Sequence, residues 1–368
     1  MGNQQVLKRV NLLRVLLALK TDLPLTKNQL CTQLQLSRPT VDRAISDLLV
    51  RGVIQNDGQS LSGGGRRAVL YSFNAQGGYT IGVDLELPEL NLVLADLSGC
   101  LVTSRSLEIP PNSIAPQAAM KFISDRVMEM VIEEGVEIDR IIGVGLGIPA
   151  FLHADKITIA GRNLPEWSEV PVKEILERLL TIPVWVDNDV NFMALAEDYT
   201  IGYHDSVLAY IALRKGLAGD IRMGGSVLVD GVLFRGASGN AVSLQHAYVE
   251  ANKLKKLRRR KLDPTATTCE LTSLVIDHLV APIMHIVTLF DPLRLVINAE
   301  ILEDGEDIFI SECARRINHN LSEFDWKIII NKAQEREFSC AKGGALFVLQ
   351  RLFNDPHRLL AELTASPS

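Results

Sequence analysis

The 368-residue sequence has only five cysteines, an odd number at distant positions, so neither a Cys-x-x-Cys metal site nor a disulfide framework is expected. Its longest apolar stretch, 271–290, is interrupted by Asp277 and Pro282, which predicts a buried helix and not a membrane span. The polar first residues contain no apolar run before a cleavage site, so we expect no signal peptide. These absences predict a reduced, cytoplasmic protein.

Glutamate is absent from the first 73 residues. This segment has ten Lys or Arg and four Asp, a formal charge of +6, so the rest of the chain carries −12 within the net −6. With 47% apolar and 22% charged residues the chain is expected to fold, and its length predicts two or three domains. A basic head on an acidic body predicts that the head meets a polyanion and that the body has another task.

Three helices are predicted in the basic segment. Apolar residues at helical spacing indicate the first over 6–19, and Thr26 is a good N-cap for the second. Ser37 caps the third, with Pro39 in its first turn. The apolar stripe of the third helix leaves Arg43 pointing away from the core. Helix, turn and polar-faced helix is the order of a helix-turn-helix.

A β-hairpin is predicted next, from strands at 53–55 and 68–73 around a Gly-rich tip that carries Arg66 and Arg67. Helices followed by such a hairpin predict a winged helix-turn-helix that binds double-stranded DNA. The alternative is a small helical dimerisation module whose arginines are solvated. The residues predicted to contact DNA are Ser37, Arg38, Thr40, Arg43, Arg66 and Arg67.

The rest of the chain repeats one plan. Three strands, a helix and a further strand are expected over 79–146, and three strands, a helix and a strand again over 207–298. This duplication is typical of the two-lobed, actin-like (ribonuclease-H-type) α/β fold, whose lobes enclose a cleft. The predicted domains are a head at 1–74, a linker at 75–78 and a body at 79–368, with lobe 1 at about 79–200 and lobe 2 at about 201–368.

Six short motifs of the body are specific in combination. They are Ile81-Gly82-Val83-Asp84, Leu146-Gly147-Ile148-Pro149, Asn163-Leu164-Pro165-Glu166-Trp167, and the segments 183–191, 231–239 and 341–345. Together they resemble the ROK family of sugar kinases and sugar-responsive repressors. The head, with Gly64-Gly65-Arg66-Arg67, resembles that of the repressor branch. The resemblance covers essentially the whole chain and implies a DNA-binding regulator with a sugar cleft.

Both phosphate-binding loops depart from the kinases of this family. The first loop there is Asp-x-Gly-Gly-Thr, whereas Asp84 is followed here by Leu-Glu-Leu-Pro-Glu. The second is a Gly-Thr-Gly-x-Gly-Gly run, whereas 214–225 lacks it and ends in Gly224-Gly225, which we interpret as a strand-edge turn. We therefore expect no enzymatic activity and no nucleotide or other cofactor.

The resemblance implies that Asn163, Asn188, Asp189 and His246 contact a sugar, with Asp189 at the position of the kinases' catalytic base. Asn188 and Asp189 have the alternative of capping the helix that follows, and His246 that of packing in the core. A sugar-contacting glutamate of the family is Ser243 here, so we expect weakened sugar binding. The family's zinc cysteines are not recognisable, so no metal is expected.

These observations predict a cytoplasmic, homodimeric regulator that represses carbohydrate-metabolism genes, binds an operator and responds to a sugar or sugar-phosphate effector. A ROK sugar kinase with a DNA-binding head, and a ligand-free dimerisation scaffold, are the alternatives. The run 253–261 has seven basic residues in nine and is either a second DNA-contacting patch beside the head or a solvated loop.

Overall fold

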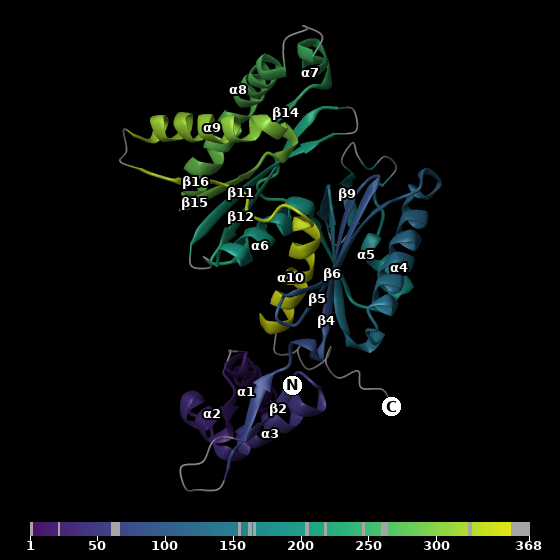
Figure 1. The fold of residues 1–368 in the computed structure, drawn as a ribbon, viewed down its shortest axis with the longest axis vertical. Coiled ribbons are helices and arrows are strands. Elements are labelled where there is room, and N and C mark those ends of the chain that lie inside the picture. Colours follow the sequence, from purple (N-terminus) through teal and green to yellow (C-terminus); the bar gives the residue numbers. More distant parts are fainter. Residues whose placement is uncertain are drawn as a thin grey trace.

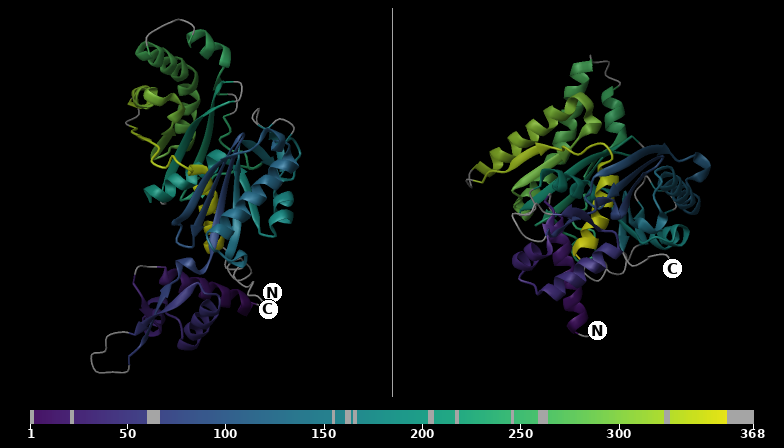
Figure 2. Two further views of the ribbon diagram at one scale, coloured as in Figure 1. Left: turned by 45° about the vertical axis from the view of Figure 1, so that its right-hand side comes forward. Right: turned by 60° about the horizontal axis from the view of Figure 1, so that its bottom comes forward.

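The structure, a computed structural model, describes residues 3–20, 23–59, 67–153, 156–160, 164, 167–202, 206–216, 219–244, 247–258, 264–322 and 326–354. The molecule is elongated, with the basic head at one end and lobe 2 at the other, and lobe 1 lies between them (Figure 1). Figure 2 shows the same order from two further sides.

The head consists of three helices and a small sheet. Its helices and strands are α1 (Asn3–Leu19), β1 (Leu25–Thr26), α2 (Lys27–Leu34), α3 (Arg38–Val50), β2 (Ile54–Gln59) and β3 (Val69–Phe73). The predicted cap at Thr26 is confirmed as a capping box, since its Oγ1 accepts from the Gln29 amide while Oε1 of Gln29 accepts from the Thr26 amide. Strand β1, which was not predicted, adds to the hairpin in the order β1-β3-β2.

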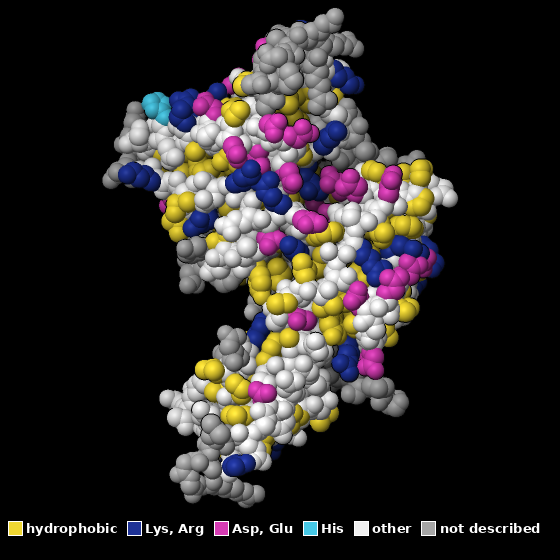
Figure 3. Space-filling model, viewed as in Figure 1, with side chains coloured by type: hydrophobic (Ala, Val, Ile, Leu, Met, Phe, Trp, Pro, Cys, Tyr) yellow, Lys and Arg dark blue, Asp and Glu magenta, His cyan; other side chains and the backbone are white. Residues whose placement is uncertain are grey.

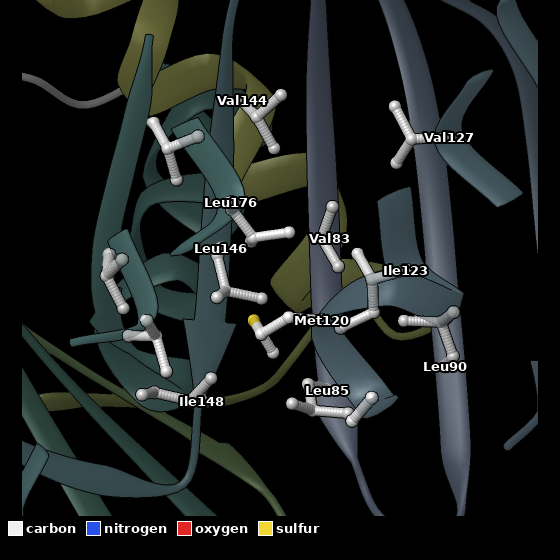
Figure 4. Close-up of a cluster of buried hydrophobic side chains, with 14 of the residues drawn as sticks. Val83, Leu85, Leu90, Met120, Ile123, Val127, Val144, Leu146, Ile148 and Leu176 are labelled. Atoms are coloured by element: carbon white, nitrogen blue, oxygen red, sulfur yellow. The ribbon is translucent and has the colours of Figure 1, made fainter. Parts of the chain in front are cut away.

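Lobe 1 is a five-stranded sheet in the order β10-β7-β4-β5-β6, covered on one face by α4 and α5. Figure 4 shows Met120, Ile123 and Val127 of α4 directed at the apolar side chains of this sheet. The bounds are β4 (Tyr79–Glu86), β5 (Glu89–Asp96), β6 (Leu101–Glu108), α4 (Pro116–Glu133), β7 (Ile141–Ile148), β8 (Ala150–His153), β9 (Lys156–Ala160), α5 (Val172–Leu180) and β10 (Val184–Asn188).

Lobe 2 repeats this plan with the order β13-β12-β11-β15-β16, and β14 pairs with β12. Strand β11 is antiparallel to β12 and parallel to β15, as β4 is to β5 and β7, so the predicted duplication is confirmed. The bounds are β11 (Val207–Lys215), β12 (Ile221–Val229), β13 (Val232–Leu233), β14 (Tyr248–Val249), α7 (Ala251–Arg258), α8 (Pro264–Phe290), β15 (Arg294–Asn298), α9 (Glu306–Leu321) and β16 (Ile329–Lys332). Short 3₁₀ helices occupy Ala75–Gly77, Pro111–Ser113, Ile138–Arg140 and Glu300–Gly305.

Strand β12 corrects one prediction. Gly224 and Gly225 lie inside this strand and pair with β11, so they are not a strand-edge turn. A Cβ at Gly224 would lie 2.5 Å from Cγ2 of Val190, which explains a glycine in the middle of a strand. The close approach brings the helix that starts near Val190 onto the sheet of lobe 2.

Two helices cross between the lobes. α6 (Asp189–Ile201) follows the last strand of lobe 1 but packs with Leu208 and Tyr210 of lobe 2, whereas α10 (Ser339–Asn354) follows lobe 2 but packs on the sheet of lobe 1. A Cβ on Gly343 of α10 would lie 1.7 Å from the carbonyl oxygen of Phe192 in α6. The backbones of the two helices therefore touch, and they join the lobes.

Helix α10 also completes the core of the head. Its buried residues Val348, Leu349, Leu352 and Phe353 belong to the same apolar cluster as the buried faces of α1 and α3. The ring of Phe353 lies 6.4 Å from that of Phe73 on β3. One helix therefore contacts both lobes at one end and the head at the other, although the domain limits given above remain predictions.

The apolar stretch 271–290 is part of α8, whose inner side packs in the core of lobe 2, as predicted. By length and composition alone, Cys269–Phe290 would also suffice to span a membrane.

The basic run 253–261 begins in α7, where Leu254 is buried. Figure 1 places α7 at the end of the molecule opposite to the head, so within one chain it is not a patch beside the head.

Candidate functional site

The outer side of α3 carries residues predicted to contact DNA. Arg43 is exposed and lies opposite the buried Val41 and Ile45. Ser37 is the N-cap residue of the helix, and its Oγ lies 2.8 Å from Oγ1 of Thr40, so the two hydroxyls form a fixed pair. This face therefore offers a guanidinium and two hydroxyls to a partner outside the chain.

Arg38, the fourth residue predicted on this helix, is held by contacts within the head. Its Nε donates to both carboxylate oxygens of Asp42 at 3.2 Å, and its Nη1 donates to Oδ1 of Asn28. Nζ of Lys27 lies 2.8 Å from the same carboxylate. The hydrogen bond from Lys27 and those from Arg38 lower the pKa of Asp42. Arg38 can therefore offer DNA only the N–H groups that these contacts leave open.

The hairpin next to α3 supplies the remaining predicted contacts. Arg67 is exposed just before β3, and Arg66 lies outside the described residues. The Leu97 amide of lobe 1 donates to the carbonyl of Ala75, directly after the head. Together with the apolar core that the head shares with α10, this bond holds the head against the body.

A cavity of about 430 Å³ lies between the lobes. Asn188, Asp189 and Ser243, all singled out in the sequence, line it, whereas Asn163 and His246 lie outside the described residues. Figure 3 shows positively and negatively charged side chains next to one another where the lobes meet. The cavity has polar and apolar lining residues and reaches elements of both lobes.

Asn188 has the capping role that was the alternative to ligand binding. Its Oδ1 accepts from the Val190 amide at 3.1 Å, and its Nδ2 donates to the carbonyl of Ala150 at 3.4 Å. The neighbouring Asn191, which was not among the predicted site residues, also lines the cavity, and its Oδ1 accepts from Oγ of Ser226. Asn191 lies three residues after Asn188, in the first turn of the helix that Asn188 caps, and this spacing could have identified it.

Asp189 is only 3% exposed, and its Oδ2 lies 3.5 Å from Nη2 of Arg214, the penultimate residue of β11. The same Nη2 donates to Oε2 of Glu86 at the end of β4. Burial raises the pKa of Asp189, and the charge of Arg214 opposes that shift. Arg214 of lobe 2 thus bridges two carboxylates on the lobe 1 side of the cleft, and this bridge was not predicted from the sequence.

A second cavity, of about 580 Å³, lies beyond this bridge and shares Glu86, Arg214 and Lys215 with the first. Five acidic residues line it, among them Asp84, which is 6% exposed, together with the basic residues Arg214, Lys215 and Arg336. Oδ1 of Asp84 has no hydrogen-bond partner within the described part of the chain. The carboxylates of Asp84 and Glu86 are unfavourable neighbours for the phosphates of a nucleotide.

Glu86 should make stability depend on pH. Burial raises its pKa from 4.5 to about 7, although the charge of Arg214 opposes the shift. The folded chain holds this proton more tightly than the unfolded chain, so Glu86 stabilises the fold below pH 4.5, and this contribution is lost as the pH rises through about 7.

Glu86→Gln removes this titration. We expect the free energy of unfolding of the variant, relative to that of the wild type, to increase by up to about 3 kcal/mol between pH 4.5 and roughly pH 8. Urea denaturation of both proteins across this range measures the difference. A difference between variant and wild type that stays constant with pH would contradict the assignment.

A sequence model described as the ROK family matches residues 80–270. The xylose repressor of Caldicellulosiruptor bescii is 26% identical over 251 residues, which are 68% of this chain and 61% of that protein. The chain thus spans about three fifths of the length of such curated relatives.

Among solved structures, a ROK family transcriptional regulator, homologous to the Escherichia coli MLC protein, has a TM-score of 0.73 at 16% identity, covering 98% of this chain and 100% of that one. For the ROK hexokinase of Thermus thermophilus the TM-score is 0.56 at 19% identity, with 75% and 100% covered. These two structures share the fold.

Proposed function

Because this chain belongs to the ROK family, we propose that it is a cytoplasmic transcriptional repressor of carbohydrate-metabolism genes, whose head binds an operator and whose cleft binds an effector. The observation that carries the proposal is the head itself. The exposed side of α3, with Arg43 and the hydroxyls of Ser37 and Thr40, adjoins a hairpin that carries Arg67. This is the arrangement of a winged helix-turn-helix.

In this arrangement α3 is the recognition helix. Its face enters the major groove, where Arg43 can donate two hydrogen bonds to a guanine edge, and the arginines of the wing reach phosphates or the minor groove. A head of charge +6 supplies the attraction to the backbone of DNA. The similarity to proteins named xylose repressors supports the same role.

We further propose a homodimer, since two symmetry-related heads read a two-fold operator whose half-sites lie one helical turn or a multiple of it apart. The head is fixed on lobe 1 and on α10, so a change in the angle between the lobes alters the separation of the two heads. An effector in the cleft would couple to operator binding in this way.

A sugar kinase is the second candidate, and the bridge at Arg214 disfavours it. A general base must be available to take a proton from the attacking hydroxyl, whereas Asp189 is paired with Arg214. The carboxylates of Glu86 and Asp84 line the cavity where a nucleotide would have to lie. Absence of ADP formation with sugars, ATP and magnesium is the result expected for a regulator.

Arg43→Ala tests the proposed DNA interface. Genomic fragments selected by the wild-type protein supply an operator, and the variant is expected to bind it about 5- to 150-fold more weakly, because a bidentate contact to a base contributes about 1–3 kcal/mol. Fluorescence anisotropy at physiological salt measures the dissociation constants on the operator and on an unrelated duplex.

Arg67→Ala is the matched variant. It is expected to weaken binding to both duplexes and to reduce the salt dependence, since a phosphate contact carries no sequence information. Wild-type affinity for the operator in both variants would rule out the proposed interface.

A further inference from the structure

A buried carboxylate, that of Asp187 near the end of β10, holds one of the asparagines that line the cavity between the lobes. Asp187 is 3% exposed, and its Oδ1 accepts from Nδ2 of Asn191 at 2.7 Å. At its other end the Asn191 amide accepts from Oγ of Ser226 in lobe 2. An amide has two donor hydrogens and two lone pairs, so Asn191 can also bind a ligand in the cavity. Such a ligand would act on the bond to Asp187.

The second oxygen of this carboxylate is paired with lobe 2. Oδ2 of Asp187 lies 2.5 Å from Nη2 of Arg235, which follows β13. A carboxylate as buried as that of Asp187 is strongly unfavourable without a counter-charge. Arg235 is therefore expected to follow Asp187 when it shifts, and its side chain, which is 39% exposed, is less confined than its partner.

Arg235 in turn contacts α10. Its guanidinium carbon lies 5.5 Å from the centre of the Phe347 ring, as does that of Arg351. A cavity of about 280 Å³, lined by residues of β13 and α10, adjoins this contact and leaves Arg235 room to change position. The residues directly after Phe347, Val348 and Leu349, belong to the apolar core of the head. A change at Phe347 therefore reaches the head through one helix, which Figure 1 shows running towards it.

These contacts lead from the cleft to the head without a gap. We propose that Asp187 and Arg235 are positioning residues that transmit the state of the cleft to the head. A ligand bound to the amide of Asn191 shifts the Asp187 carboxylate, and Arg235 moves with it. The contact of Arg235 with Phe347 then changes the position of α10. This coupling rests on the proposed function, which gives the cleft an effector and the head an operator.

Asn191→Ala tests the coupling without any ligand, because it removes the hydrogen bond to Asp187 from the cleft side. Amide hydrogen exchange of the full-length chain, measured by mass spectrometry, is expected to become about threefold faster or more in α10 and in the helices of the head. Arg235→Gln breaks the proposed connection. Adding Asn191→Ala to that variant is therefore expected to cause no further change in exchange at α10 or in the head.

Arg222→Gln is the matched control. Arg222 of β12 is also paired with a buried carboxylate, that of Asp220, at 2.7 Å, so this variant loses a comparable ion pair. In its background Asn191→Ala should accelerate exchange as much as in the wild type. Arg235→Lys keeps the charge but loses the planar group over Phe347, so the effect of Asn191→Ala should be smaller than in the wild type. This variant decides the matter if Arg235→Gln does not fold.

The coupling is refuted if Asn191→Ala leaves exchange in α10 and the head at wild-type rates, or if it accelerates exchange equally with Arg235 and with a substituted residue there. Operator affinity is measured on the same variants, and Asn191→Ala should change it about threefold or more when Arg235 is present. If the wild type selects no duplex but exchange is coupled, the proposed function fails and the connection to α10 stands. Operator binding without coupled exchange refutes the connection alone.

Discussion

Replacing Gly343 with alanine is expected to reduce the free energy of unfolding by about 3 kcal/mol or more. The added Cβ would lie 1.7 Å from the carbonyl oxygen of Phe192, and this contact is between backbones, so no rotamer change relieves it. The higher helix propensity of alanine, about 1 kcal/mol, does not offset the clash. Helices α6 and α10 must move apart, which also separates the lobes.

Chemical denaturation followed by circular dichroism measures this loss. Asn354→Ala, at the exposed end of the same helix, is the control and should change stability by less than about 0.5 kcal/mol. A Gly343→Ala protein as stable as this control would show that the two helices have room between them.

Leu352→Ala is expected to destabilise the head selectively, by about 2–5 kcal/mol. Leu352 is 1% exposed and lies in the apolar cluster shared by α10, α1 and α3, so its truncation leaves a cavity between head and body. Because the proposed recognition helix α3 depends on that core, operator affinity should fall although no residue of the proposed DNA-contacting face has changed.

Limited proteolysis reports this effect as earlier cleavage within the first 74 residues, and anisotropy reports the loss of operator binding. Leu289→Ala provides a matched truncation at a leucine that is 77% exposed on α8 and should change neither property. If the two variants were cleaved by the protease at the same rate and bound the operator with the same affinity, the head would not depend on α10.

Local signals predicted most of the secondary structure. Gln29 follows Thr26 by three positions, the spacing of a capping box, so the sequence alone identifies the start of α2. The alternation of apolar residues likewise indicated the strands of both lobes, because each strand buries at least one face. Fold class followed from the order of these elements.

Contacts between distant segments could not be predicted in this way. Gly224 looks like a turn residue, and only the position of Val190, 34 residues earlier, explains it as the middle of a strand. The pairing of Arg214 with Glu86 joins residues 128 positions apart, and no spacing rule connects them. The resemblance to the ROK family, and not a spacing rule, predicted Asn188 and Asp189 as cleft residues, and both line the cavity.

The core shared by the head and α10 has a consequence for synthesis of the protein. A ribosome releases α1 to α3 first, and Leu349, Leu352 and Phe353 follow some 300 residues later. Until then the nascent head has an uncovered apolar side. A prematurely terminated chain that lacks α10 would therefore carry an incomplete head, and under the proposed function it would not compete with the full-length protein for operators.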